Sequence, residues 1–220
     1  MKKRYQFPKS AAFGRNLAKS KIYEYATPST KIKNLFVNEV EKITWSYKLS
    51  QITINLPPAQ GIHEIQVFSI GLKTDKLSYE ILSTIDKAIP SPILFELKYK
   101  SSIQYIACYK RPNKVDKEKS VTSNYFHSNW IKDDAPTREL PIVLNIAALY
   151  QSLLTSISPL PLRKGESLED LVARFDLLQA KEKERIKLEN QITKEKQYNR
   201  RVELNRVLNT IKLEINNLKL

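Results

Sequence analysis

The spacing of apolar side chains predicts several amphipathic helices in the first 160 residues. Apolar positions recur at intervals of three or four, which places them on one face of a helix. Gly14 lowers the helical propensity of the first such segment, and Asn145 can cap the last one. The helices expected from this period span residues 9–25, 30–49, 78–89 and 145–157.

Extended segments are expected between these helices, where β-branched and alternating residues occur. They span residues 51–56, 63–73, 93–100, 102–111 and 122–131, with a polar loop over 112–121. The run 63–73 is apolar on both faces, so we expect it to be buried on both. The link between 93–100 and 102–111 is so short that these strands should form a hairpin. The pattern predicts an α+β fold with an antiparallel or mixed sheet flanked by helices.

The last third of the chain has a different pattern. Proline and glycine cluster over 159–165, and neither occurs again before the C-terminus. Ser167 and Asp170 have the spacing of a capping box, which predicts a helix start. We therefore expect an α+β domain over 1–160, a linker over 161–165 and a helical coiled-coil arm over 166–220.

Two apolar seams in this arm have different registers. They consist of Leu168, Leu171, Phe175 and Leu178, and of Leu204, Leu208, Ile211, Ile215 and Leu218. The mismatch allows either one long helix with stutters or two helices packed as a hairpin. In both cases the apolar seam requires a partner surface.

Charge is unevenly distributed. The chain has 37 Lys and Arg against 23 Asp and Glu, a net charge of +14, and residues 1–48 hold 11 basic and 3 acidic side chains. Such a field attracts polyanions, so DNA or RNA is an expected partner. The side chains expected to contact nucleic acid are Lys2, Lys3, Arg4, Arg15, Lys19, Lys21, Lys31 and Lys33.

Several functional classes are excluded by what the sequence lacks. The four glycines are too dispersed for a P-loop or a dinucleotide-binding turn, and the two histidines and single cysteine form no recognisable zinc site. We expect no bound cofactor or metal. No apolar run is long enough for a membrane span, and one cysteine, Cys108, fits a reducing cytoplasm and a buried position.

One catalytic alternative remains. Glu96 and Lys98 lie two residues apart on an apolar strand and so share a face. Mg²⁺-dependent nucleases of the PD-(D/E)xK type use such a pair, with the carboxylate on the metal and the lysine near the attacking water. The upstream acids available are Asp75, Glu80 and Asp86, and none is well placed because a predicted helix precedes the strand. The simpler interpretation is an ion pair on a strand face.

Four blocks of the sequence resemble a bacterial family catalogued as domain of unknown function four-three-nine-one. They are Thr30–Trp45, Ile89–Glu96, Tyr109–Pro112 and Lys196–Asn205. The resemblance implies an accessory protein encoded beside helicases and DNA methyltransferases of restriction or phage-defence loci, without a known catalytic set. The last block lies where the apolar seam is weakest, so we expect Lys196, Tyr198, Arg200 and Arg201 to contact a partner.

These observations favour a cytoplasmic, non-catalytic accessory subunit of a bacterial DNA-processing complex. It would bind a helicase or methyltransferase through the arm and nucleic acid through its basic flanks. Two alternatives stay open. One is the Mg²⁺-dependent nuclease, and the other is a coiled-coil homodimer without a nucleic-acid role.

Overall fold

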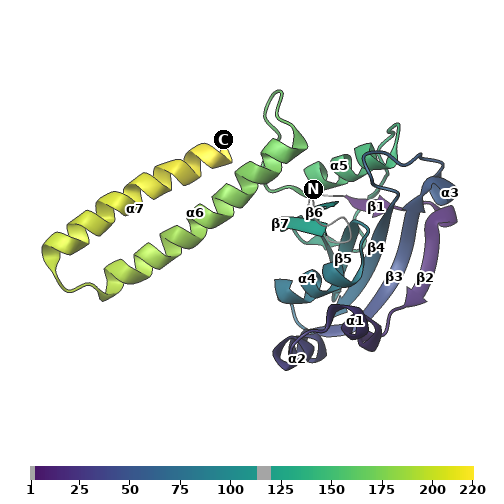
Figure 1. Ribbon diagram of the computed structural model, residues 1–220, viewed down its shortest axis with the longest axis horizontal. Helices are drawn as coiled ribbons and strands as arrows, with labels where there is room; N and C mark the ends of the chain where they lie inside the picture. Colours follow the sequence, from purple (N-terminus) through teal and green to yellow (C-terminus); the bar gives the residue numbers. More distant parts are fainter. Residues whose placement is uncertain (1–2, 113–119) are drawn as a thin grey trace. The chain divides into compact units, whose positions relative to one another are not determined.

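A computed structural model describes residues 3–112 and 120–220, and the chain divides into two compact units, 1–159 and 160–220 (Figure 1). Lys2 and most of the predicted loop 112–121 therefore lie outside the described residues. Within the described part of the chain, no helix combines the length and apolar character needed to cross a membrane.

Unit 1 contains the two sheets that the described residues form. Its strands are β1 (Arg4–Gln6), β2 (Ala12–Asn16), β3 (Val40–Ser50), β4 (Glu64–Leu72), β5 (Ile93–Tyr99), β6 (Ser102–Pro112), β7 (Ser120–His127), β8 (Ile131–Lys132) and β9 (Thr137–Glu139). Its helices are η1 (Lys9–Ala11), α1 (Lys19–Ala26), α2 (Thr30–Glu39), α3 (Gln51–Ile54), α4 (Tyr79–Ala88) and α5 (Ile146–Ile157).

The main sheet is mixed, as the sequence predicted. Its order is β2-β3-β4-β5-β6-β7, with β8 also paired to β6. Neighbours are antiparallel except β4 and β5, which run parallel because α4 crosses over between them. A separate parallel pair joins β1 to β9, at opposite ends of unit 1 in the sequence.

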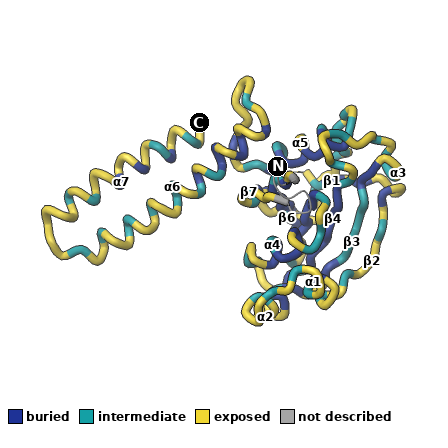
Figure 2. The backbone as a smooth tube through the Cα atoms, viewed as in Figure 1, coloured by how far each residue is buried: buried dark blue, intermediate teal, exposed yellow. Residues whose placement is uncertain are grey.

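Helices cover the two faces of the main sheet differently. On one face, α1, α2 and α4 pack over a core that includes Phe36, Phe68, Ile85 and Phe95. Helix α5 contacts β4, β6 and β7 from the other face (Figure 1). Strand β4 lies between these layers, and Figure 2 shows it largely in dark blue. The prediction that this strand is buried on both faces is confirmed.

Three further predictions from the periodicity are confirmed. Helices α4 and α5 form where the pattern places them, and the Asn145 side chain caps α5 by accepting a hydrogen bond from the Ala148 N–H at 2.9 Å. Strands β5 and β6 form the expected antiparallel hairpin. Cys108 is buried and forms no disulfide.

The prediction of a single helix over 9–25 is wrong for the first half of that range. Residues 12–16 form the edge strand β2, and the helix begins only at Lys19. Gly14 has a φ of 66°, a left-handed conformation favoured by glycine, at a bulge where the pairing of β2 with β3 shifts. Residues 12–16 therefore pair with β3 although their apolar spacing is helical, and Gly14 had already lowered the helix propensity of this segment.

The prediction of a helix over 30–49 is wrong for the second half of that range. Helix α2 ends at Glu39, and β3 continues directly from Val40. Lys19 stabilises this helix end because its Nζ donates to the carbonyls of Phe36 at 2.8 Å and Val40 at 2.6 Å. Residues beyond it include the β-branched Val40, Ile43 and Thr44 and the aromatic Trp45 and Tyr47, and the strand pairs with β4.

Two expected strands also need correction. Residues 51–56 form no strand; Ser50 and Thr53 make a capping box that starts the short helix α3. The strand expected over 122–131 ends at His127 as β7, and Ile131 begins the separate strand β8. Local hydrogen bonds of Ser and Thr compete with strand pairing, which explains the first error.

Unit 2 is a helical hairpin made of α6 (Leu168–Lys194) and α7 (Tyr198–Lys219), so the tail is two helices. Ser167 and Asp170 form the predicted capping box. Ion pairs between the helices join Lys181 to Glu214 at 2.7 Å and Glu182 to Lys219 at 2.8 Å. The buried apolar residues are Leu168, Leu171, Val172, Phe175 and Leu178 on α6 and Leu208, Ile211 and Ile215 on α7. Coiled-coil packing is not confirmed.

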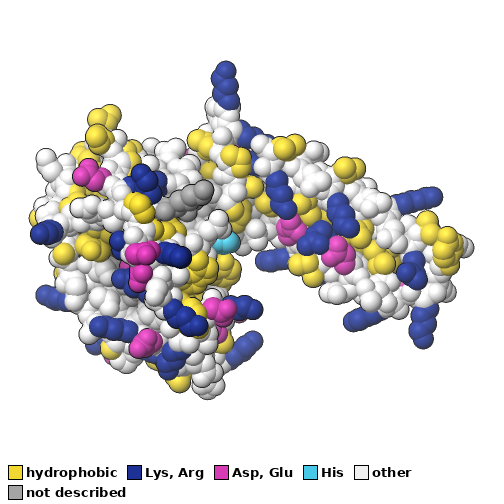
Figure 3. Space-filling model, turned by 180° about the vertical axis from the view of Figure 1, so that it is seen from behind, with side chains coloured by type: hydrophobic (Ala, Val, Ile, Leu, Met, Phe, Trp, Pro, Cys, Tyr) yellow, Lys and Arg dark blue, Asp and Glu magenta, His cyan; other side chains and the backbone are white. Residues whose placement is uncertain are grey.

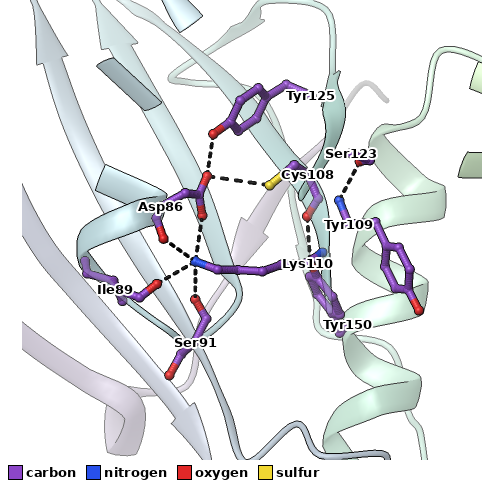
Figure 4. A network of polar contacts seen from close by, with 9 residues as sticks. All are labelled: Asp86, Ile89, Ser91, Cys108, Tyr109, Lys110, Ser123, Tyr125 and Tyr150. Carbon is purple, nitrogen blue, oxygen red and sulfur yellow. Dashed lines mark hydrogen bonds and ion pairs between the residues drawn. The ribbon is translucent and has the colours of Figure 1, made fainter. Parts of the chain in front are cut away.

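A buried ion pair connects α4 to β6 inside unit 1. Lys110 Nζ lies 3.2 Å from Asp86 Oδ1, and both side chains are 2% exposed. The same ammonium donates to the carbonyls of Asp86 at 2.6 Å and Ile89 at 2.5 Å, near the end of α4 (Figure 4). Lys110, on β6, thereby caps the C-terminal end of α4, the helix that connects β4 to β5.

Hydrogen bonds satisfy the remaining atoms of this network. The Tyr125 hydroxyl donates to Asp86 Oδ2 at 2.5 Å, and Cys108 Sγ donates to the same oxygen at 3.5 Å. On the other side, the Tyr150 hydroxyl of α5 donates to the Cys108 carbonyl at 2.5 Å (Figure 4). Burial raises the pKa of the Asp86 carboxyl, and the Lys110 charge opposes that shift.

We expect Lys110→Met to lower the free energy of unfolding of unit 1 by about 3–5 kcal/mol, because it leaves a buried carboxylate and helix-end carbonyls without their cation. Both tryptophans, Trp45 and Trp130, lie in unit 1, so urea denaturation followed by tryptophan fluorescence measures the change. Lys87→Met, at an exposed position of α4, is the matched control and should change stability by less than about 0.5 kcal/mol. Equal effects of the two substitutions would contradict the role assigned to Lys110.

Unit 2 contains a pH-sensitive ion pair. Arg174 Nε and Nη2 donate to the two Glu166 carboxylate oxygens at 2.7 and 2.8 Å. These hydrogen bonds hold the pKa of Glu166 at about 2, below its usual 4.5, although burial acts in the opposite direction. The stabilisation is therefore present above pH 4.5 and is lost as the pH falls from 4.5 towards 2.

We expect Glu166→Gln to destabilise the hairpin at neutral pH and to make its stability less sensitive to acid. The measurement is the urea midpoint from circular dichroism at several pH values. The difference between wild type and variant should shrink below pH 4.5. Glu203→Gln, at an exposed site on α7, should follow the wild type throughout, and a constant gap between wild type and Glu166→Gln would refute the assignment.

Candidate functional site

A pocket opens on the sheet face opposite the α4 layer, and it contains the Glu96–Lys98 pair. Its volume is about 370 Å³. Its lining comes from the N-terminal segment, residues 4–14, which includes β1 and part of β2, and from strands β3 to β6. The lining residues are Arg4, Tyr5, Phe7, Ala12, Gly14, Ser46, Tyr47, Ser69, Glu96, Lys98, Ile103 and Tyr105.

Strand register brings the polar residues of the pocket together. The parallel pairing of β4 and β5 sets Ser69 opposite Glu96, and β6 sets Tyr105 on the other side of Glu96. A bulge in β3 between Trp45 and Tyr47 lets Ser46 reach the same face. Bulges of this kind re-aim side chains, and here the result is a group of polar side chains around Glu96.

Glu96 is the centre of a hydrogen-bonded chain. Its Oε1 accepts from Ser69 Oγ at 2.9 Å and lies 2.8 Å from Lys98 Nζ. Ser46 Oγ in turn donates to Ser69 Oγ at 2.8 Å. The Glu96 side chain is 10% exposed and that of Lys98 is 50% exposed, so the carboxylate is largely withdrawn from solvent while the ammonium reaches it.

Two tyrosines connect this chain to the N-terminal segment. The Tyr105 hydroxyl accepts a hydrogen bond from the Tyr5 backbone N–H at 3.0 Å, which fixes β1 beside the sheet. Burial raises the pKa of Tyr105, and the nearby Glu96 carboxylate raises it further, so the hydroxyl stays protonated. Burial also raises the pKa of Tyr5, although its bonds to Ser156 and Arg138 oppose this.

The pocket supplies only some of the residues that the nuclease alternative requires. Glu96 and Lys98 share one face and line an open pocket, as that alternative requires. Asp86 lies on the opposite face with Lys110, and neither Asp75 nor Glu80 lines the pocket. Across residues 3–112 and 120–220, no group of three or more His, Cys, Asp or Glu side chains could hold a metal ion.

A smaller hollow continues from the pocket along β3 and β4. It shares Ser46, Ser69 and Lys98 with the pocket and adds Glu41 and Lys42 to the polar lining. The Lys98 side chain therefore lines both the pocket and the smaller hollow. The sheet face is polar along this whole path because its strands carry serine, threonine and charged residues at alternate positions.

The predicted nucleic-acid contacts do not form one surface. Arg4 lines the pocket, and Arg15 lies on β2 with its guanidinium 4.7 Å from the Phe13 ring. Lys19 is committed to the end of α2, and Lys21 pairs with Glu24 at 3.0 Å. The remaining ones, Lys3, Lys31 and Lys33, are exposed. On the face drawn in Figure 3, Lys and Arg side chains are dispersed and form no single patch.

The predicted partner contacts do cluster. Lys196 lies in the connection between α6 and α7, and Tyr198, Arg200 and Arg201 occupy the start of α7. All four are exposed, with Tyr198 at 78%, and Figure 2 shows this connection in yellow. We call residues 194–201 the hairpin tip.

Sequence reasoning missed Ser46, Ser69 and Tyr105 as pocket residues. Nothing in the local pattern marks them, because a bulge and a parallel crossover bring them together.

Comparison with known proteins identifies a family. No curated protein and no solved structure matches the chain. The model of the family described as Domain of unknown function (DUF4391) matches residues 6–215. That range includes strands β2 to β9, helix α6, the hairpin tip and α7 as far as Ile215, whereas Arg4 and Tyr5 of the pocket precede it. On the strength of this match over nearly the whole chain, the protein belongs to the DUF4391 family.

Proposed function

We propose that the protein is a non-catalytic accessory subunit of a bacterial DNA-processing complex, of the restriction or phage-defence type. In this proposal the exposed lysines of α2 contact nucleic acid, and the hairpin tip contacts a protein partner such as a helicase or methyltransferase. The proposal rests on how the positive charges are compensated in different parts of the molecule.

The stem of the hairpin compensates its charges within the chain. Arg185 pairs with Glu182 and Glu189 at 2.8 and 2.9 Å, and Lys181 pairs with Glu184 as well as Glu214. Such pairs contribute little stability individually. Outside residues 194–201, unit 2 holds 10 basic and 9 acidic side chains, so the stem is nearly neutral overall.

The hairpin tip differs from the stem. Among the described residues, Arg200 pairs with Glu195 at 3.4 Å, whereas no ion pair is recorded for Lys196 or Arg201. Beside these cations lies the largely exposed ring of Tyr198. Tyrosine and arginine are the residues that most often anchor protein interfaces, so this combination suits an acidic, partly apolar partner surface. The excess of basic side chains at the hairpin tip, next to a nearly neutral stem, is the observation on which the proposal rests.

Helix α2 offers a second uncompensated surface. Lys31 and Lys33 are exposed near its start, and within the described part of the chain neither forms an ion pair. Lys33 Nζ lies 5.6 Å from the centre of the Tyr23 ring. Exposed lysines of this kind contact phosphates without selecting a sequence, and their contribution falls as salt increases.

We expect the full-length protein to bind DNA with an affinity that falls steeply between about 50 and 200 mM salt. The double substitution Lys31→Glu and Lys33→Glu should weaken binding roughly tenfold or more and lower the salt slope by about two. Fluorescence anisotropy with labelled duplex and single-stranded DNA measures both quantities.

A charge-matched control is available on the hairpin stem. Lys183→Glu with Lys187→Glu changes the net charge equally at two exposed positions of α6 and should have a much smaller effect. Equal loss in the control would mean that only net charge matters. Charge reversal at Arg200 and Arg201 should leave DNA affinity intact, and a large loss there would contradict the assignment of the tip to a protein.

The pocket favours a second candidate, the Mg²⁺-dependent nuclease, because Glu96 and Lys98 face a solvent-connected cavity. The accessory proposal predicts that plasmid DNA incubated with the protein and Mg²⁺ stays uncut, and that Glu96→Ala changes nothing. Cleavage that requires Mg²⁺ and disappears in Glu96→Ala would establish the nuclease and refute the non-catalytic proposal.

A further inference from the structure

The pocket on β3 to β6 has three kinds of wall. One carries a guanidinium, one carries a carboxylate with hydroxyl groups, and one is aromatic. Its volume of about 370 Å³ lies within the range of small-molecule sites. All of these walls belong to unit 1, so the site is complete in that unit.

Arg4 is held in a way that leaves part of its guanidinium available. Its Nε donates to the Ala135 carbonyl at 3.0 Å, which fixes the side chain at the pocket wall. Among the described residues, no carboxylate pairs with Arg4. A fixed guanidinium with free terminal N–H groups presents the planar pair of donors that suits a phosphate.

Charge in the pocket also favours an anion. Glu96 is compensated by Lys98 at 2.8 Å, which leaves the Arg4 charge as the excess. Because the Lys98 side chain is half-exposed, its ammonium can contact a ligand as well as Glu96. The pocket thus combines a net positive charge with a buried carboxylate.

The carboxylate and its hydroxyl partners give the pocket hydrogen-bonding groups of both kinds. Ser46 and Ser69 are linked to Glu96 Oε1 in one chain, so a ligand hydroxyl can add to that chain as donor or acceptor. A ligand that had only anionic groups would have no donor for the Glu96 carboxylate, which only accepts hydrogen bonds. One that combines an anion with hydroxyl groups fits both parts of the site.

Aromatic rings form the remaining wall. Phe7 and Tyr47 are stacked with their centroids 4.6 Å apart, and Phe7 is buried while Tyr47 is half-buried. Both rings line the pocket. Such a surface can stack with a planar heterocycle.

We propose that this pocket binds a nucleotide. The phosphate lies against Arg4 and Lys98, a sugar hydroxyl joins the chain of Glu96, Ser69 and Ser46, and the base lies against Tyr47. The nucleotide has two possible sources with the same chemistry, a free nucleoside monophosphate or the 5′-phosphorylated end of a strand. This inference goes beyond the proposed accessory function, which uses other surfaces.

The test is isothermal titration calorimetry of the full-length protein with nucleoside monophosphates, the corresponding nucleosides, inorganic phosphate and a short 5′-phosphorylated oligonucleotide. We expect the monophosphate or the phosphorylated end to bind more tightly than either the nucleoside or phosphate alone. The tighter of these two ligands identifies the source.

Substitutions locate the binding. Arg4→Ala and Lys98→Met should each weaken monophosphate binding roughly tenfold, because each removes a phosphate partner. Because Lys98→Met also removes the ion-pair partner of Glu96, tryptophan fluorescence is used to check that this variant is folded before its binding is compared. Lys87→Met on α4 removes an exposed charge outside the pocket and should leave binding unchanged.

Three results would overturn the proposal. They are no binding of any monophosphate or phosphorylated end at millimolar concentration, equal binding by wild type and Lys98→Met, and inorganic phosphate binding as tightly as the nucleotide. Failure of this proposal can be distinguished from failure of the proposed accessory function, because the two use different surfaces. Loss of DNA binding in the α2 variant with pocket binding intact supports both, while an empty pocket beside normal DNA binding refutes only this one.

Discussion

The buried contact between Lys110 and the end of α4 is the interaction on which the rest of unit 1 depends. A lysine with 2% exposure is costly unless its charge is paired and its donors are used, and here a carboxylate and helix-end carbonyls supply the partners. Because α4 is the crossover between β4 and β5, fixing its end also fixes where β5 begins. The register of the sheet follows from that position.

Register in turn builds the pocket on the other face of the sheet. With β5 parallel to β4, Ser69 lies opposite Glu96, and the bulge in β3 completes the chain at Ser46. A slip of one residue would turn Glu96 towards the apolar layer around Phe95. The buried polar network on one face and the open polar pocket on the other are therefore consequences of one arrangement of strands.

The basic residues of this protein have several structural roles, so charge alone is a poor guide to function. Lys19 and Lys110 stabilise helix ends, Arg174 organises the base of the hairpin, and Lys181 belongs to the stem network. Only the side chains left over from these tasks are available to a polyanion or an acidic partner. This distinction separates Lys19, which is bonded to a helix end, from the exposed members of the predicted N-terminal set, and the four predicted residues of the hairpin tip are all exposed.

The sequence by itself determined those elements whose local pattern agrees with their final environment, such as the buried strand β4, the amphipathic helices α4 and α5, and the capped start of α6. It also placed Glu96 and Lys98 on one face. Residues 12–16 and 40–49 were predicted as helix because their apolar spacing is compatible with 3.6 residues per turn, and only pairing between β2, β3 and β4 made them strands. The pocket was likewise decided by tertiary structure, because bulges and a parallel crossover have no signature in a single segment. Strand pairing depends on residues distant in sequence, whereas helix periodicity and capping depend on neighbours a few residues away.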